Sequence, residues 1–188
     1  MLADLSGKTA IITGGGQGLG FGISTKMAQQ GANLIITDID DRNKSAISDL
    51  ASKYDIKYLY IEMNVTDQSQ VENGINEALE FSDVDILVNN AGVAGAPGST
   101  GTVWRDEDWD FTWEVNVKGL HRVTEAVLPH MIEKQSGKII NISSVAARAA
   151  KYTTSYYATT KMAVIAYTQA LAREFGPKNI NVNAIAPG

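Results

Sequence analysis

Cysteine is absent from this 188-residue sequence, and histidine occurs only twice, at His121 and His130. Without cysteine the chain can form neither a disulfide nor a zinc site with thiolate ligands, and such a composition suits a reducing compartment. Both histidines fall inside one expected helix, and no G-x-S-x-G sequence is present, so a Ser-His-Asp hydrolase would lack its usual elbow. We therefore expect no bound metal and no hydrolase triad.

Long apolar runs and clusters of lysine or arginine are also missing. No apolar stretch approaches the ~20 residues that span a bilayer, and the N-terminus from Met1 to Asp4 does not show the charged-then-apolar pattern of a signal peptide. The net charge is -5, so nucleic acid is not an expected partner. These absences favour a soluble cytoplasmic protein that binds neither membranes nor nucleic acid.

Short apolar runs alternate with helical patterns along the whole chain. Six runs are typical of buried strands, at 8–13, 33–38, 56–62, 84–88, 138–141 and 179–184. Helices are expected from the glycines after residue 13 to about 30, and over 41–53, 68–79, 106–134 and 155–174, with a break near Thr112 and a loop at 93–103.

This alternation predicts an α/β fold over residues 1–188 as one domain. Near-continuous apolar strands indicate a parallel sheet with helices on both faces, which is a three-layer α/β/α arrangement. Right-handed crossovers then give a doubly wound parallel sheet, whose ligand crevice lies at the carboxyl ends of the strands.

A glycine-rich stretch, TGGGQGLG at residues 13–20, follows the first expected strand directly. The spacing G-x-x-x-G-x-G fits at Gly14, Gly18 and Gly20. It also fits at Gly16, Gly20 and Gly22, but there the first glycine does not follow the strand immediately. Such glycines let the backbone approach a pyrophosphate, which then lies at the N-terminus of the next helix. The alternative is a tight turn that binds no ligand.

Asp38 closes the second expected strand, roughly 20 residues after the glycines. An acid at this place can accept hydrogen bonds from an adenosine ribose. The alternative is a helix N-cap or a loop charge, a role for which Asp40 and Asp41 compete. The sequence pattern by itself does not decide between the two.

Polar residues also follow the fourth and fifth expected strands. The stretch NNAG at 89–92 is either part of the crevice or a polar turn, since Asn and Gly tolerate positive φ. The hydroxyls of Ser143 and Ser144 either donate to a substrate oxygen or cap a loop.

Tyr157 and Lys161 lie four residues apart in the expected helix at 155–174, so the phenol and the ammonium can reach the same space. A phenol has an ordinary pKa of about 10, too high for a general base at neutral pH, and a nearby cation lowers it. The pair could then act in proton transfer. The alternative is a surface pair of the kind common on helices.

Taken together, these motifs resemble the short-chain dehydrogenase/reductase family. The resemblance covers essentially the whole chain in order and spacing, and it is carried by the glycines of 13–20, the NNAG stretch, Asn116, Ser144, the Tyr157-x-x-x-Lys161 pair, and Pro187 with Gly188. It implies a Rossmann-like domain and NAD(P)-dependent interconversion of an alcohol and a carbonyl.

The resemblance also implies roles for individual residues. Tyr157 would be the acid/base, Lys161 would hold the nicotinamide ribose, Ser144 would bind the substrate oxygen, and Asn116 would support a water relay to Lys161. The cofactor site would comprise Gly14, Gln17, Gly18, Leu19, Gly20, Asp38, Ile39, Asn64, Val65, Asn90, Ala91, Gly92, Tyr157, Lys161, Pro187 and Gly188. Relatives more often carry Asp where this chain has Asn64.

Family members continue beyond the position of Gly188 through a substrate-covering loop, helices and another strand. We therefore expect the sequence to be incomplete after its sixth strand, because a missing strand would leave an apolar sheet edge open. The substrate pocket would be lined by residues 93–96, 145–152 and that further segment.

Asp38, together with the neutral Gln17, favours NAD over NADP, because the carboxylate would repel a 2′-phosphate. We expect a small-molecule alcohol or ketone as substrate. A 3-oxoacyl-thioester reductase of the same family is one alternative; such enzymes usually prefer NADPH and carry a basic residue at the position of Gln17. A non-catalytic subunit that binds nucleotide is another alternative.

A homo-oligomer, either a dimer or a tetramer, is also expected. The helices at 106–134 and 155–174 carry apolar residues on more than one face, and such helices bury both faces. The residues concerned are Trp109, Trp113, Val123, Val127, Ala166 and Ala170.

Overall fold

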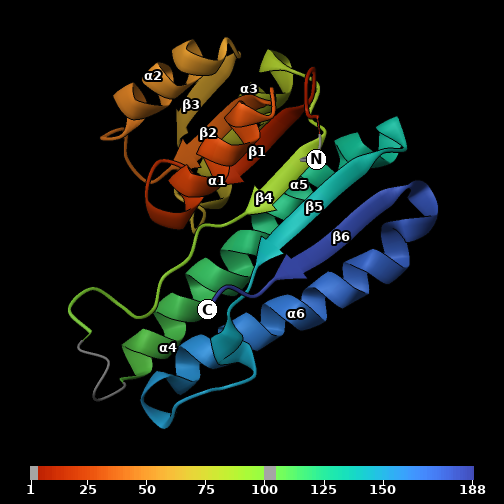
Figure 1. Ribbon diagram of the computed structural model, residues 1–188. Helices are drawn as coiled ribbons and strands as arrows, with labels where there is room; N and C mark the ends of the chain where they lie inside the picture. Colours follow the sequence, from red (N-terminus) through yellow and green to blue (C-terminus); the bar gives the residue numbers. More distant parts are fainter. Residues whose placement is uncertain (1–3, 100–104) are drawn as a thin grey trace.

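The computed structural model describes residues 4–99 and 105–188 (Figure 1). Its centre is a parallel sheet of strands that are each four to six residues long. The order across the sheet is β3-β2-β1-β4-β5-β6, which is that of a doubly wound fold. The strands are β1 (Thr9–Thr13), β2 (Asn33–Asp38), β3 (Tyr58–Glu62), β4 (Ile86–Asn89), β5 (Gly137–Ile142) and β6 (Ile180–Ile185). The predicted fold class is confirmed.

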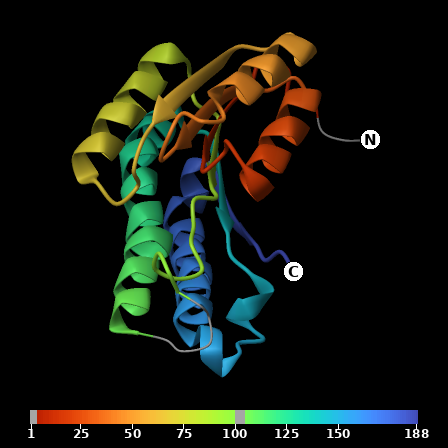
Figure 2. The same ribbon diagram turned by 90° about the vertical axis from the view of Figure 1, so that its left-hand side faces the viewer.

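Helices cover the sheet on both faces (Figure 2). On one face α1 and α2 pack over the β1–β3 half, and on the other α3, α5 and α6 lie against the strands. The helices are α1 (Gly18–Gln29), α2 (Lys44–Tyr54), α3 (Gln68–Phe81), α4 (Asp106–Trp113), α5 (Leu120–Lys134) and α6 (Ser155–Phe175). Short 3-10 turns lie at Val145–Ala147, Tyr152–Thr154 and Gly176–Lys178.

The core consists of two apolar layers because successive strand residues point to opposite faces. Ile11 of β1 and its partner Ile35 of β2 pack under α3 and α5, whereas Ile12 and Ile36 pack under α1 and α2. All four side chains are completely buried. Burial on both faces explains why β1, β2 and β4 are nearly continuous apolar runs, whereas the edge strand β6 begins with buried and exposed residues in alternation.

The structure corrects two local predictions and decides between the two interpretations of residues 89–92. The helix expected at 41–53 begins at Lys44, with Asn43 before it, so none of the nearby aspartates caps it. Asn89 is a buried strand residue rather than part of a turn, and none of residues 89–92 has a positive φ. The break expected near Thr112 is instead a π-helical segment, Glu114–Gly119, that joins α4 to α5. Of the loop expected at 93–103, residues 100–104 lie outside the described part.

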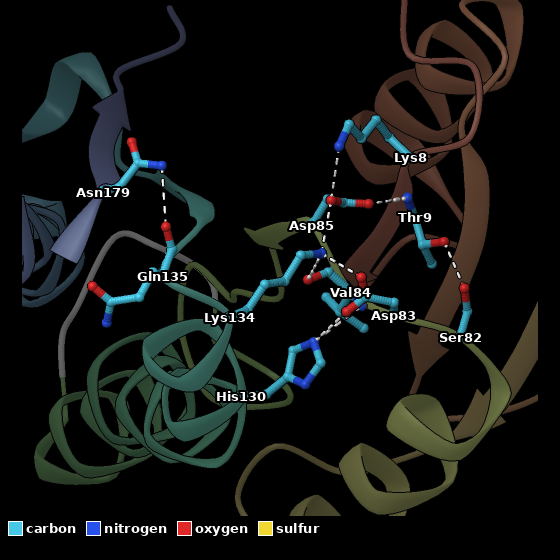
Figure 3. A network of polar contacts seen from close by, with 10 residues as sticks. All are labelled: Lys8, Thr9, Ser82, Asp83, Val84, Asp85, His130, Lys134, Gln135 and Asn179. Carbon is cyan, nitrogen blue, oxygen red and sulfur yellow. Dashed lines mark hydrogen bonds and ion pairs between the residues drawn. The ribbon is translucent and has the colours of Figure 1, made fainter.

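A polar cluster joins β1, β4 and α5 at the amino end of the strands (Figure 3). Asp85 accepts hydrogen bonds from Lys8 Nζ at 3.1 Å, from the Thr9 amide at 3.0 Å and from Lys134 Nζ at 2.9 Å. Lys134 also pairs with Asp83 at 2.7 Å. These contacts fix the strand order at the end of the sheet opposite the carboxyl ends.

Over β4, β5 and β6 the face shared with α1 holds an apolar hollow of about 470 Å³, lined by residues such as Ile23, Met27, Ile140 and Ile185. Ile185 is 51% exposed there.

In the part of the chain that the structure describes, no helix is both long and apolar enough to cross a membrane.

Candidate active site

A cleft of about 610 Å³ lies at the carboxyl ends of the strands, where β1 and β4 are neighbours and the strand order reverses. This reversal is the place where doubly wound sheets bind ligands, because the loops after the two central strands diverge to opposite faces. The cleft is lined by Gly14, Gln17, Leu19, Gly20, Asp38, Ile39, Met63, Asn64, Val65, Thr66, Asn90, Ala91, Gly92, Val93, Ala94, Phe111, Val115, Ile142, Ser143, Ser144, Tyr157, Lys161, Pro187 and Gly188.

The glycine-rich loop leads from β1 into α1 along this cleft. A side chain at Gly20 is impossible, because its Cβ would lie 2.0 Å from the carbonyl oxygen of Gly14. Gln17 precedes α1, and among the described residues no side chain caps the first turn of that helix. The amide groups of this turn, around Leu19, therefore remain available to an anion, and the helix dipole favours one.

Thr13 and Asn90 join the loops that follow β1 and β4. The Thr13 hydroxyl accepts hydrogen bonds from the Asn90 amide at 3.1 Å and from the Ala91 amide at 3.0 Å. In return, Asn90 Nδ2 donates to the carbonyl oxygens of Thr13 and Gly14, both at 2.9 Å. These hydrogen bonds hold the loop after β4 against the glycine-rich loop, so Asn90 helps to fix the shape of the cleft.

Asp38 lies at the end of β2 and is only 8% exposed. Its carboxylate accepts hydrogen bonds from the Gly16 amide at 3.1 Å and the Ile39 amide at 2.9 Å. Burial and the charges of Asp38, Asp40, Asp41 and Glu62 raise the pKa of the neighbouring Tyr60 to about 12. This corner of the cleft therefore carries a negative potential.

Arg42 is the nearest cation in sequence to this acidic corner. Its guanidinium pairs with Asp40, with Nη2 2.6 Å and Nε 2.9 Å from the carboxylate oxygens. The Arg42 side chain is 75% exposed and is absent from the cleft lining. The cation nearest to Asp38 in sequence is thus already paired with another carboxylate.

Tyr157 and Lys161 both face the cleft from the first turns of α6. The Lys161 ammonium lies 5.7 Å from the centre of the Tyr157 ring, and Lys161 is only 5% exposed. Burial lowers the pKa of Lys161 to about 8, and its Nζ donates to the Ile142 carbonyl at 2.9 Å. Four-residue spacing on a helix therefore does bring these two groups into one site.

Asn116 lies in the π-helical segment and is buried at 1% exposure. Its side chain accepts from the Val93 amide at 2.8 Å, and donates to the Val93 carbonyl at 2.9 Å and to the Thr160 hydroxyl at 3.0 Å. A Cβ added to Gly92 would touch both Asn116 Oδ1 and Lys161 Nζ, at 3.1 and 3.2 Å. Asn116 therefore lies behind the cleft wall, close to Lys161, rather than in the lining.

The two serines after β5 have different surroundings. The Ser143 hydroxyl is buried and donates to the Lys161 carbonyl at 2.8 Å, so it fastens α6 to the sheet. The Ser144 hydroxyl is partly exposed at the cleft and accepts from the Ala146 amide at 3.1 Å. The Val145 amide donates to the Pro187 carbonyl at 2.9 Å, which places Pro187 and Gly188 beside this loop.

The structure brings nearly all of the predicted site residues to one cleft. The exceptions are Gly18, which begins α1 outside the lining with a φ of 53°, and Asn116. Asn64 and Val65 line the cleft after β3, and the Asn64 side chain accepts from the Thr66 amide and hydroxyl. Residues 93–96 were expected in the substrate pocket, and of these Val93 and Ala94 line the cleft, as does Ser143. The lining residues that the sequence did not predict are Met63, Thr66, Phe111, Val115 and Ile142.

The donors and acceptors of the cleft fit a dinucleotide. Uncapped amides at the start of α1 suit a pyrophosphate, and the Asp38 carboxylate suits ribose hydroxyl groups. Leu19 and Ile39 flank the cleft with side chains that are 52% and 60% exposed, which suits the flat faces of a base. Among the described residues, no group of three or more His, Cys, Asp or Glu side chains is placed to hold a metal ion.

Comparison with known proteins gives matches over nearly the whole chain. The model of the family described as short chain dehydrogenase matches residues 8–188. The 3-oxoacyl-[acyl-carrier-protein] reductase FabG of Aquifex aeolicus is 36% identical over 194 residues, which cover 98% of this chain and 74% of that protein. The oxidoreductase UcpA of Escherichia coli is 40% identical, over 100% of this chain and 71% of its own length.

A solved structure of NAD+-bound xylitol dehydrogenase superimposes with a TM-score of 0.91 and 28% sequence identity. The superposition covers 99% of this chain and 72% of that one. The compared proteins are therefore longer than the sequence described, and they share its fold across essentially all of it.

Proposed function

Because this chain belongs to the short chain dehydrogenase family and is thus an oxidoreductase with a nicotinamide cofactor, we propose that it interconverts a secondary alcohol and a ketone with NAD. The observation that carries the proposal is the placement of Tyr157, Lys161 and Ser144 on the same cleft as the glycine-rich loop. An acid/base, a cation and a hydroxyl then surround one space at the end of a nucleotide-binding groove.

In the direction of oxidation, the Tyr157 oxygen takes the proton of the substrate hydroxyl, and in reduction it returns that proton to the carbonyl oxygen. Ser144 donates a hydrogen bond to the same oxygen, where negative charge develops. The Lys161 ammonium supplies positive charge next to the phenol, and with a pKa of about 8 it is mostly protonated at neutral pH. The nicotinamide, when bound, supplies or accepts the hydride.

The contacts of Asn116 support a role for this residue in positioning its neighbours in the site. Its side chain holds both backbone groups of Val93 and the Thr160 hydroxyl, on the residue preceding Lys161. Such a contact keeps the wall after β4 and the first turns of α6 at a fixed separation. Catalytic geometry within fractions of an ångström depends on buried supports of this kind.

The surroundings of Asp38 support NAD rather than NADP. The carboxylate is almost buried, its neighbours Asp40 and Asp41 are acidic, and Arg42 is paired with Asp40. A 2′-phosphate, with about -1.5 to -2 charges near neutral pH, would meet like charge at this place. A 2′-hydroxyl would instead donate to the carboxylate.

Reduction of a 3-oxoacyl thioester is the second candidate, because a 3-oxoacyl-[acyl-carrier-protein] reductase is among the relatives, at 36% identity. The two candidates share the residues of the cleft and differ in the substrate and in the preferred cofactor. Gln17 and Asp38 weigh against an NADPH-dependent reductase, since neither offers a positive charge to a 2′-phosphate.

Self-association into a dimer or tetramer is part of the proposal. Trp113 is 38% exposed on α4, and Ala166 and Ala170 form an exposed strip on α6. Val123 and Val127, which the sequence analysis counted toward a second apolar face, are completely buried in the core, so they are not open to a partner. Sedimentation at micromolar concentration tests this: dimers or larger species support it, and a monomer contradicts it.

A screen of secondary alcohols with NAD, and of ketones and a 3-oxoacyl thioester with NADH and NADPH, tests the proposed function. The proposal predicts turnover of at least one secondary alcohol with NAD. Turnover confined to the thioester with NADPH would favour the second candidate. Binding of NADH without any turnover would favour a non-catalytic nucleotide-binding protein.

A further inference from the structure

The segment Val93–Ala96 follows β4, and its first two residues, Val93 and Ala94, line the cleft. It has left the sheet, so its backbone groups have no strand partner, yet buried backbone groups need hydrogen bonds. Side chains from three other elements supply them. Asn116 binds Val93, Tyr156 binds Ala94 and Asp108 binds Ala96.

Tyr156 immediately precedes Tyr157 on α6 but points into the protein, with 1% exposure. Its hydroxyl donates to the Ala94 carbonyl at 3.1 Å, and its ring meets that of Trp109 edge-on at 6.4 Å. One helix turn thus presents Tyr157 to the cleft and anchors the opposite wall through Tyr156. The separation of the phenol from this wall is then set by a single rigid element.

Asp108, in the first turn of α4, has no exposed surface. Its carboxylate accepts from the Ala96 amide and from the Arg105 amide, both at 3.0 Å. The Arg105 guanidinium and these amide groups hold the pKa of Asp108 at about 2, so the group is ionised at any physiological pH. A charged acceptor of this kind makes stronger hydrogen bonds than a neutral one.

Gly95 lies between the two anchored residues with a φ of 150°, a conformation that L side chains rarely adopt. A Cβ there would come within 2.9 Å of the Ser99 side chain and 3.2 Å of the Tyr156 hydroxyl. The segment therefore runs in direct contact with the Tyr156 side chain. It has no room to shift toward α6.

We propose that Tyr156 and Asp108 are positioning residues that fix Val93–Ala96 as the substrate-side wall facing Tyr157. This proposal rests on the proposed function of the same cleft. The two residues act on the alcohol or ketone rather than on the cofactor, because their hydrogen bonds to the segment go to Ala94 and Ala96 and not to the glycine-rich loop or Asp38. Loss of either anchor lets the wall move, and small displacements at a reacting centre reduce the rate strongly.

The test uses Tyr156→Phe and Asp108→Asn, which preserve side-chain shape. The first matched control is Tyr167→Phe, which changes another tyrosine of α6, one whose hydroxyl donates to Glu125 of α5. The second is Asp85→Asn, which alters a largely buried carboxylate at the opposite end of the sheet. Two quantities are measured below the melting temperature of each protein. The first is the amide hydrogen exchange of a peptide covering 93–98, and the second is substrate and cofactor affinity, measured as KM for the ketone and Kd for NADH.

Both test variants are expected to speed exchange of the 93–98 peptide by roughly fivefold or more, the effect of losing one hydrogen bond. They are expected to raise KM for the ketone by a similar factor, with the Kd of NADH changed less than about twofold. The controls are expected to leave the exchange rate, KM and Kd unchanged.

Unaltered exchange in both variants would overturn the proposal, because the anchors would then not hold the segment. Faster exchange with an unaltered KM, or an equal loss of NADH affinity, would overturn the positioning role. If the wild type binds NADH but turns over no alcohol or ketone, the proposed function fails, and the anchoring is then judged by hydrogen exchange alone.

Discussion

Asp38 is the residue expected to determine the preference for NAD over NADP, and Asp38→Ser is the substitution that tests this expectation. Asp38 is 8% exposed and its side chain already accepts hydrogen bonds from two backbone amides, so it is fixed in place at the end of β2. A ribose bound there would bring its 2′ substituent within a few ångströms of the negative charge.

The magnitude follows from Coulomb's law. Two unit charges ~4 Å apart repel by about 4 kcal/mol at an effective dielectric constant of 20, and solvent at the rim of the cleft reduces this to about 2 kcal/mol. That remainder corresponds to roughly thirtyfold in affinity. Since a phosphate carries more than one charge near neutral pH, about thirtyfold is the lower end of the expected preference for NAD.

The assay is kcat/KM with NAD and with NADP for the wild type, Asp38→Ser and Asp41→Ser. Asp38→Ser is expected to reduce the ratio of NAD to NADP by roughly thirtyfold or more, through loss of repulsion as well as loss of the ribose contact. Asp41→Ser removes an equal charge from an exposed position outside the cleft and is expected to change the ratio by less than about threefold. A wild type that uses both cofactors equally would refute the reasoning and point to Arg42 leaving Asp40 for the ribose.

Three further changes test other parts of the structure. Gly20→Ala is expected to abolish NADH binding, because the new Cβ would overlap the Gly14 carbonyl at 2.0 Å; calorimetry measures this, and an unchanged Kd would contradict it. NADH affinity is expected to fall as the pH rises through about 8, where Lys161 loses its charge, and to be flat in Lys161→Met; a flat wild-type profile would contradict it. Burial disfavours the ionised Asp85, but hydrogen bonds from Lys134, Thr9 and Lys8 outweigh it and hold its pKa below the usual value. The stability that ionised Asp85 adds is present above its unfolded pKa of about 3.9 and is lost as the pH falls through its folded pKa. Asp85→Asn should therefore lower the free energy of unfolding by roughly 1.5–3 kcal/mol at neutral pH and by less in acid. Equal urea midpoints for the two proteins at neutral pH would contradict this.

The central strands β1, β2 and β4 were predictable because each is a short, mostly apolar run that is buried on both faces. Ile11, Ile12, Ile35 and Ile36 carry that signal without any help from distant residues. The glycines after β1 were equally predictable, since the backbone contact at Gly20 excludes every side chain. The helix beginning at Ser155 placed Tyr157 and Lys161 on one face by its spacing alone.

Contacts between distant segments were not predictable from local pattern. Asp108 and Tyr156 look like an ordinary first-turn acid and a surface aromatic, and only the fold brings them to Ala96 and Ala94, 12 and 62 residues away. The polar turn that was one of two interpretations of residues 89–92 is absent, because Asn89 is buried in β4 and donates to Thr124 of α5 and Asn141 of β5. No periodicity marks a polar residue as a strand residue when its partners lie elsewhere.

Tyr157→Phe, compared with the wild type and with Tyr167→Phe, tests the central claim most directly. The substitution removes one oxygen and leaves the ring beside Lys161, so the Kd of NADH is expected to change by less than about twofold. With a secondary alcohol and NAD, kcat is expected to fall by at least ~10²-fold, the lower end of what general acid–base catalysis contributes. A Tyr157→Phe protein that turns over at nearly the wild-type rate would contradict the assignment of Tyr157 as the proton-transferring residue.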